Sequence, residues 1–394
     1  MAQSPIKVAW FSYFPVEWLP GMPDEVSRLP RQHAASWQRV LLNELQSDPE
    51  LKLHIVVLRK QFPRNLTFDR NGVTFHLVKT LGGTRAPSLF WADTILIGRV
   101  LRQVKPDVVH AWGTEHGAAL VANRLGYPRV ATVQGLFTWY VRVALRDWHS
   151  RLAARLEDYT LSSPKTQCVT TEARFSVNYL RQRYPRLRVE QVEHAPDPVF
   201  HRIERRPQTT PVRFVFVGAF DHRKGADVLA GALDAVREEI PFECIVIGKA
   251  RPDYLEQVRQ RVSPALWQRI SFRENLTHLD VAGELSTATI MLCPTRADVS
   301  PNAVKEAVVA GVPVVGTNVG GIPDYVFPDK NGVLCAPDDL PAFAEAIRCA
   351  CRHPLFGQGR VEETTLEQVR EYLSPKLMAR KFRDIYRRLA TGTF

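Results

Sequence analysis

The sequence predicts an α/β protein with two doubly wound domains that face each other across a cleft. Short apolar or β-branched runs alternate with helical patterns, as in parallel sheets covered by helices on both faces. The alternation stops at residues 203–211, a polar and charged segment that contains proline, and then starts again. The chain has 394 residues, the length of two or three average domains. We therefore expect two domains joined by a short linker.

The elements of the N-terminal domain, residues 1–205, follow from its apolar runs. Strands are predicted at residues 7–14, 53–58, 73–78, 107–111, 129–133 and 167–171. Helices are predicted between most of these strands, at residues 33–45, 92–104 and 140–161.

The C-terminal domain, residues 206–375, repeats the pattern. Strands are predicted at residues 213–218, 242–248, 270–272, 289–293 and 313–316. Helices are predicted at residues 227–236, 254–262, 280–285, 301–310 and 340–350. Residues 366–389 are expected to form one or two basic helices. The last of them, in residues 376–394, is expected to pack back toward the N-terminal domain.

The composition is that of a globular protein, with 45% hydrophobic and 24% charged residues. Residues 1–14 have the pattern of a first strand rather than of a secretory signal, and no segment has the pattern of a membrane-spanning helix. The six cysteines include no CxxC pair and no zinc-like spacing. We therefore expect reduced thiols and a cytoplasmic location.

The net charge of +11 is unevenly distributed. Residues 1–200 contain 26 Lys/Arg and 17 Asp/Glu, which gives +9, and the rest of the chain carries the remaining +2. An anionic membrane, an acidic substrate or nucleic acid would suit the basic half, and a solvated arginine-rich surface is the alternative. Residues 137–156 interleave aromatic residues with Arg142, Arg146, Arg151 and Arg155. Such a helix can lie on an anionic membrane or pack with a solvated basic face.

The first motif that indicates chemistry is FVFVGAFDHRKGADVL, residues 214–229. An apolar strand ends at Gly218, and a short loop with Arg223 and Lys224 leads into a helix. Free amides at a helix start and two cations together favour an anion site. The alternative is a surface turn with two solvated cations.

The second motif is PTRADVSPNAVKEAVVAGVPVVGTNVGGIPDYV, residues 294–326. Asp298 lies in a polar loop after a buried strand, and Glu306 lies about one turn into the next helix, so both can face one cleft. Carboxylates accept hydrogen bonds from sugar hydroxyls, and the amides of Asn302 and Ala303 favour a phosphate or sugar oxygen. The alternative is that Asp298 and Ser300 only cap the helix and that Glu306 is a surface residue.

These residues resemble the donor-site signature of the retaining glycosyltransferases of family 4, also described as glycosyl transferases group 1. The segments that carry the resemblance are DVSPNAVKEA, AGVPVVGTNVGGIPDYV and NGVLCAPDD, with weaker echoes in DVVHAWG, VATVQG and EHAPDPVF. The resemblance implies the GT-B fold of two Rossmann-like domains. It also implies a retaining, metal-independent transfer of a hexose from a UDP- or GDP-linked sugar, with no cofactor and no bound metal.

The resemblance also implies a role for individual residues. Lys224 would meet the donor diphosphate, Asp298 would hold hydroxyls of the transferred sugar, and Glu306 would bind the ribose. The implied catalytic residues are Asp298, Lys224 and Gln134, and the implied donor-binding residues are Gly218, Arg223, Lys224, Ser300, Pro301, Asn302, Ala303 and Glu306.

Three positions depart from the family pattern. Asp298 replaces the usual glutamate and is one methylene shorter, and Gln134 replaces the usual histidine near the sugar. Ala219 stands where an arginine is frequent, so Arg223 is expected to supply the second cation.

On the acceptor side, Gly21 in the long loop of residues 15–30 and His110 at a strand end are expected to line the entrance. The alternatives are that the loop is a passive connection and that His110 has a structural role. The expected acceptor is a saccharide or lipid-linked molecule, as in polysaccharide biosynthesis, with the protein peripheral to the inner face of a membrane. An epimerase or phosphorylase on the same scaffold is the alternative. Nucleic acid is not an expected partner, because no nucleic-acid-binding module is recognisable.

Overall fold

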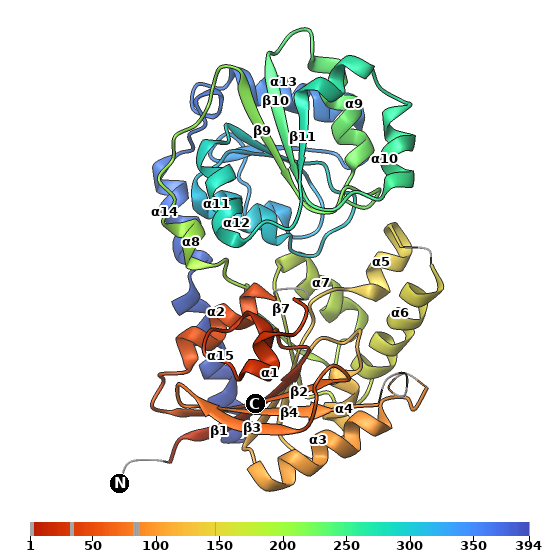
Figure 1. The fold of residues 1–394 in the computed structure, drawn as a ribbon, viewed down its shortest axis with the longest axis vertical. Coiled ribbons are helices and arrows are strands. Elements are labelled where there is room, and N and C mark those ends of the chain that lie inside the picture. Colours follow the sequence, from red (N-terminus) through yellow and green to blue (C-terminus); the bar gives the residue numbers. More distant parts are fainter. Residues whose placement is uncertain are drawn as a thin grey trace.

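The computed structural model describes residues 4–31, 35–81, 83, 85, 87–145 and 147–393. Figure 1 shows two α/β domains stacked along the long axis of the molecule, with the N-terminal domain below and the C-terminal domain above. Each domain has its own sheet, and the predicted class of two doubly wound domains is confirmed. No helix in the described residues is long and apolar enough to cross a membrane.

The N-terminal sheet has the strand order β3-β4-β2-β1-β5-β6-β7-β8, and only β3 runs antiparallel to its neighbour. Its strands are β1 (Ile6–Ser12), β2 (Leu51–Arg59), β3 (Leu66–Arg70), β4 (Val73–Lys79), β5 (Val108–Trp112), β6 (Arg129–Thr132), β7 (Cys168–Thr171) and β8 (Arg188–Gln191). The sequence did not predict β3 and β8, which lie at the two edges of the sheet. Edge strands are only partly buried and so lack a continuous apolar run.

The helices of the N-terminal domain cover both faces of this sheet. They are η1 (Val16–Trp18), α1 (Asp24–Ser27), α2 (Ser36–Leu45), α3 (Trp91–Val104), α4 (Ala118–Arg124), α5 (Phe137–Val143), α6 (Trp148–Leu161), α7 (Arg174–Arg183) and α8 (Pro198–His201).

The helix predicted at residues 140–161 is in fact two helices. Asp147 caps α6 by accepting a 2.9 Å hydrogen bond from the amide of Ser150, which starts a new helix after α5. On α5, Trp139 packs on Phe175, with ring centroids 4.6 Å apart, and the hydroxyl of Tyr140 accepts from the amide of Val299. The aromatic residues of α5 therefore face inward, and residues 137–156 do not form one helix on the surface; Arg146 lies outside the described residues.

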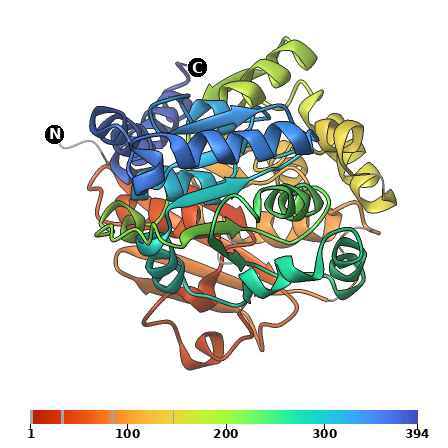
Figure 2. The same cartoon turned by 90° about the horizontal axis from the view of Figure 1, so that it is seen from above.

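The C-terminal sheet is fully parallel, with the order β11-β10-β9-β12-β13-β14. Its strands are β9 (Val212–Val217), β10 (Phe242–Ile247), β11 (Ile270–Arg273), β12 (Ile290–Cys293), β13 (Val314–Thr317) and β14 (Gly332–Cys335), of which only the edge strand β14 was not predicted. The α-helices are α9 (Ala226–Val236), α10 (Pro252–Arg259), α11 (His278–Thr287), α12 (Asn302–Ala310), α13 (Leu340–Arg352), α14 (Glu363–Tyr372) and α15 (Pro375–Ala390). Seen from above, helices flank this sheet on both faces (Figure 2).

The last helix, α15, leaves the C-terminal domain and packs against α2, β1 and β5 of the N-terminal domain. The buried hydroxyl of Tyr386 accepts a 3.0 Å hydrogen bond from Nε1 of Trp10 and lies 2.7 Å from Nδ1 of His110. His110 is 0% exposed, and burial lowers the pKa of its imidazole well below the usual value, which keeps it neutral. The prediction that His110 lines the acceptor entrance is therefore wrong, because α15 covers it.

We predict that Tyr386→Phe destabilises the protein by about 1–3 kcal/mol, because it leaves the buried nitrogens of Trp10 and His110 without their shared partner. Urea unfolding followed by fluorescence measures the change. Tyr159→Phe is the control, since Tyr159 is 69% exposed and its substitution should cost less than about 0.5 kcal/mol. Equal stability of the two variants would contradict this role for Tyr386.

Candidate functional site: the interdomain cleft

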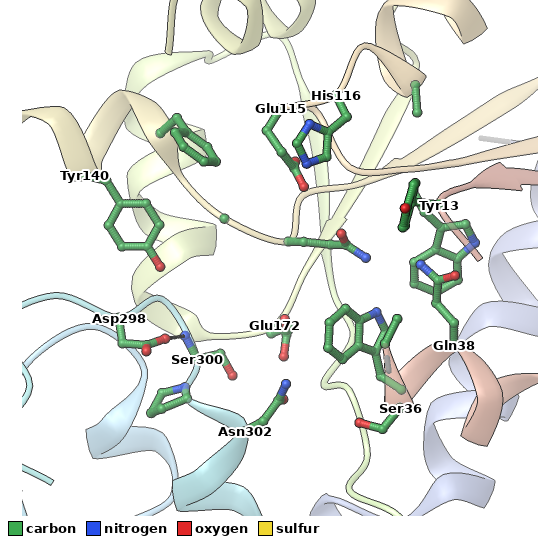
Figure 3. Close-up of a pocket in the computed structure, with 18 of the residues that line it drawn as sticks. Tyr13, Ser36, Gln38, Glu115, His116, Tyr140, Glu172, Asp298, Ser300 and Asn302 are labelled. Carbon is green, nitrogen blue, oxygen red and sulfur yellow. Dashed lines mark hydrogen bonds between the residues drawn. The ribbon is translucent and has the colours of Figure 1, made fainter. Parts of the chain in front are cut away.

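A cleft of about 1030 Å³ separates the two domains. One wall consists of residues that follow β1, β5, β6 and β7, and the other of residues that follow β9 and β12 together with the start of α12. The carboxyl ends of strands from both sheets therefore meet at this cleft, which is where open α/β sheets bind ligands. Figure 3 shows its central part.

The cleft brings together all the catalytic and donor-side residues that the sequence predicts. These are Gln134, Gly218, Arg223, Lys224, Asp298, Ser300, Pro301, Asn302, Ala303 and Glu306. Gly21, in contrast, is exposed elsewhere, and none of the described residues in the loop of residues 15–30 lines the cleft. Val16, Leu19, Met22 and Val26 are buried in the N-terminal core and hold this loop away from the entrance that it was predicted to shape.

The carboxylate of Asp298 lies beside two cationic side chains. Nζ of Lys224 lies 2.6 Å from Oδ2 of Asp298, and Nη1 of Arg223 lies 3.4 Å from the same oxygen. Burial opposes the ionisation of Asp298, but Lys224 and Arg223 outweigh it and hold the pKa of Asp298 below its usual value. Two positive charges and one negative charge leave this group of three side chains with a net charge of +1, which suits an anionic ligand.

Two glycines allow the loops that carry these charges to touch. Gly225 has φ of +73°, and a Cβ at this position would lie 2.0 Å from the carbonyl oxygen of Pro294. Gly320 has φ of +56°, and a Cβ there would lie 1.6 Å from the carbonyl oxygen of Asp298. A side chain at either position would thus push a neighbouring loop away from the site.

The start of α12 presents unpaired backbone donors to the cleft. The amides of Asn302 and Ala303 have no hydrogen-bond partner in the part of the chain that the structure describes. Ser300, just before the helix, is oriented by a 2.8 Å contact between its hydroxyl and that of Tyr325. Amides at a helix N-terminus carry partial positive charge, so this end of α12 adds to the anion-binding character of the wall.

Glu306 lies one turn further along α12 and lines the cleft on the same side. Burial raises the pKa of its carboxyl, partly offset by the nearby charges of His278 and Lys305. The helix therefore presents free amides at its start and a half-buried carboxyl one turn later. Asp298 and Glu306 face one cleft, as their spacing of eight residues predicts.

A buried ionic cluster, which we call the Glu172 cluster, joins the two walls. Lys305 on α12 forms a salt bridge with Oε2 of Glu172, and Nδ1 of His194 lies 3.0 Å from Oε1 of the same carboxylate. All three residues are at most 5% exposed. Burial opposes the ionisation of Glu172, but the charges of His194 and Lys305 lower its pKa to about 2.

The sequence analysis did not identify the Glu172 cluster as part of the site. Glu172 directly follows the predicted strand of residues 167–171, so the rule that located Asp298 at a strand end could have identified it. Lys305 precedes Glu306, but a lysine beside a predicted site residue gives no sign that it is buried. Figure 3 places Glu172 between the two walls, facing Asn302.

Other residues of the N-terminal wall were also not predicted. Figure 3 shows Tyr140 pointing its hydroxyl toward the Asp298 loop, and that hydroxyl accepts a 3.2 Å hydrogen bond from the amide of Val299. Tyr13, Glu115 and His116 line the far part of the cleft. Beside them, Nε2 of Gln134 has no hydrogen-bond partner among the described residues and faces the cleft, so it can donate to a ligand.

Two doubly wound domains with a cleft between their strand ends define the GT-B architecture. Two family descriptions match the chain in tandem: "Glycosyltransferase Family 4" at residues 39–199 and "Glycosyl transferases group 1" at residues 211–353. The matches follow the two domains and together span most of the chain. The chain therefore belongs to the family 4 glycosyltransferases of GT-B fold.

Individual relatives are more distant. The chain is 27% identical over 270 residues to a glycogen synthase of Mycobacterium tuberculosis, in an alignment that covers 66% of this chain and 63% of the relative. It thus spans under two thirds of the length of that relative.

Solved structures agree on the fold. The sucrose-phosphate synthase of Thermosynechococcus elongatus superposes with a TM-score of 0.80 at 16% identity and covers 98% of this chain and 100% of its own. Anabaena Alr3699/HepE in complex with UDP-glucose superposes with a TM-score of 0.66 at 13% identity, over 96% of this chain and 99% of its own.

We predict that Lys305→Met destabilises the protein by about 3–5 kcal/mol, because it removes one of the two cationic partners of a buried carboxylate. The double variant Lys305→Met/Glu172→Gln should recover much of this loss, since the carboxylate that lost its lysine is then also absent. Denaturant unfolding of the single and double variants measures the coupling. Additive losses in the double variant would show that the pair does not act as a unit.

Proposed function

We propose that this protein is a retaining, metal-independent glycosyltransferase that moves a hexose from a nucleotide-diphosphate sugar to an acceptor on the N-terminal wall. The observation that carries the proposal is the arrangement around α12. Its free amides lie between Asp298 and Glu306, and Lys224 and Arg223 approach Asp298. A nucleotide-diphosphate sugar fits this order. Its hydroxyls can donate to the two carboxylates, and its diphosphate can accept from the amides and cations between them.

The residues have separate tasks in this reaction. Glycosyl transfer develops positive charge at the anomeric carbon and negative charge on the departing diphosphate. Lys224, Arg223 and the α12 amides stabilise the diphosphate as its charge grows. Asp298 and Gln134 orient the sugar through its hydroxyls, and Glu306 accepts hydrogen bonds from the ribose.

The same arrangement disfavours a covalent intermediate on the enzyme. Lys224 and Arg223 hold Oδ2 of Asp298, while Lys305 and His194 occupy both oxygens of Glu172. Neither carboxylate is therefore offered as a free nucleophile. Lys224 and Arg223 also supply the positive charge that a metal ion would otherwise bring to the diphosphate.

We infer that the donor carries UDP, with GDP as the second candidate; the HepE structure with bound UDP-glucose supports UDP. The acceptor is a saccharide or a lipid-linked saccharide. It would contact Tyr13, Glu115 and His116 on the N-terminal wall, where an aromatic ring and polar groups suit a sugar. We place the reaction in the cytoplasm, at the inner face of a membrane.

We predict that Glu306→Ala raises the donor KM about ten- to a hundredfold, because a charge-assisted hydrogen bond contributes roughly 1.5–3 kcal/mol. Steady-state kinetics with UDP-glucose as donor would measure this value. Glu367→Ala, on exposed α14 surface, is the matched control. An unchanged donor KM in Glu306→Ala would refute the assignment to the ribose.

We also predict that transfer continues in EDTA and that the product keeps the anomeric configuration of the donor. Release of UDP measures the first, and the anomeric proton coupling in the NMR spectrum of the product measures the second. Activity that disappears in EDTA and returns with manganese would overturn metal independence. An inverted product would overturn retention while leaving the donor site intact.

A further inference from the structure

The exposed large apolar side chains are concentrated on one flank of the N-terminal domain. Of the eleven that are exposed among the described residues, eight lie between residues 81 and 159. This segment includes α3, α4, α5 and α6, which lie side by side along one flank in Figure 1. An exposed apolar patch on a globular protein usually marks a binding surface.

On α3, the outward face carries apolar residues and arginines. Trp91, Ile95, Arg99 and Arg102 fall on one stripe at helical spacing, and all four are exposed. Trp91 is 54% and Ile95 is 52% exposed. The opposite face of the same helix packs into the core. The exposed face of such a helix is usually polar, but here it carries apolar side chains.

The exposed face of α6 is rich in apolar side chains, although Ala154 and Leu161 are buried. Its buried face includes the polar residues Ser150, Glu157 and Thr160, whereas its exposed stripe consists of Trp148, Leu152, Arg155 and Tyr159. The carboxylate of Glu157 is buried because Thr114 and Thr138 donate hydrogen bonds to it. Three large apolar or aromatic side chains of α6, those of Trp148, Leu152 and Tyr159, therefore lie on the surface.

Arg124, at the end of α4, joins the two stripes. Its guanidinium lies 4.3 Å from the ring centroid of Trp91 and donates to the carbonyl oxygen of Leu89. The helix α4 itself packs against both α3 and α6. The stripes of α3 and α6 therefore form one surface, which we call the α3–α6 band.

The band is basic as well as apolar. Arg99, Arg102, Arg151 and Arg155 are exposed, and none forms a salt bridge within the described part of the chain. Tryptophan and tyrosine prefer the boundary between lipid and water, and arginines there attract anionic headgroups. We propose that the α3–α6 band docks on an anionic lipid bilayer.

The position of the band relative to the cleft gives this docking a consequence. Asp93 lies in the first turn of α3, two residues from both Trp91 and Ile95, yet it is 2% exposed and lines the cleft. The band and the acceptor end of the cleft are therefore opposite sides of one helix, about 10–12 Å apart. If the proposed function holds, a docked molecule receives its acceptor from the bilayer.

The test is co-sedimentation of the full-length protein with vesicles of phosphatidylcholine, with or without phosphatidylglycerol, at low and high salt. Wild type should bind the anionic vesicles at low salt and bind the neutral vesicles weakly. Arg99→Gln/Arg151→Gln should lower binding to anionic vesicles roughly thirtyfold, about fivefold for each arginine. Trp91→Ser/Trp148→Ser should lower binding at both salt concentrations, because the apolar contribution is not screened.

Matched controls come from the exposed surface of the C-terminal domain. Arg261→Gln/Arg360→Gln removes the same charge, and Leu279→Ser removes a side chain that is 71% exposed; neither should change vesicle binding. Calorimetry with UDP should give wild-type affinity for every variant, which shows that each is folded and tests the donor site separately.

Equal binding by band and control variants would overturn the proposal. A second result would also overturn it: wild type does not bind vesicles, and it forms a dimer in sedimentation velocity that is lost in Trp91→Ser/Trp148→Ser. The band would then bind a second copy of the chain. Vesicle binding without binding of either UDP or GDP would leave the docking surface standing and refute the proposed function instead.

Discussion

The Glu172 cluster is the interaction on which the geometry of the cleft depends. A charge in a protein interior is tolerated only when a partner neutralises it. Glu172 and His194 belong to the N-terminal domain and Lys305 to α12 of the C-terminal domain, so the charges are satisfied only when the two domains are in contact here. Lys305 adjoins Glu306 and lies near the free amides of α12. The salt bridge that neutralises Glu172 therefore also holds the C-terminal wall of the cleft against the N-terminal wall.

The meeting of the proposed donor-side residues at one cleft could be predicted from the sequence because its determinants are local. Gly218, Arg223 and Lys224 follow one strand, and Asp298, Ser300 and Glu306 span one strand–loop–helix unit. Parallel strands end at one edge of a sheet, so the two segments had to meet once their strands were recognised. The resemblance to family 4 then assigned roles to positions that the strand pattern had already brought together.

The acceptor side could not be predicted because its geometry depends on contacts that are distant in sequence. His110 ends up in the core because Tyr386 on α15, 276 residues away, covers it. The loop of residues 15–30 turns from the cleft because its apolar residues join the N-terminal core, and apolar residues at irregular spacing give no direction. Glu172 needs Lys305 from the other domain. In each case the missing information is tertiary packing, which neither periodicity nor local motifs contain.

The positive charge on the described residues of the N-terminal half does not lie where it could attract a substrate into the cleft. The cations that meet Asp298 come from the C-terminal half, which carries only +2 of the net charge. In the N-terminal half, the one described Lys or Arg that lines the cleft is Arg85, and Asp93 neutralises it at 2.7 Å. The exposed arginines of α3 and α6 lie instead on the outer flank. Under the two proposals, the excess charge of the N-terminal half acts on the docking surface, and donor binding depends on a few cations placed where a diphosphate's charge develops.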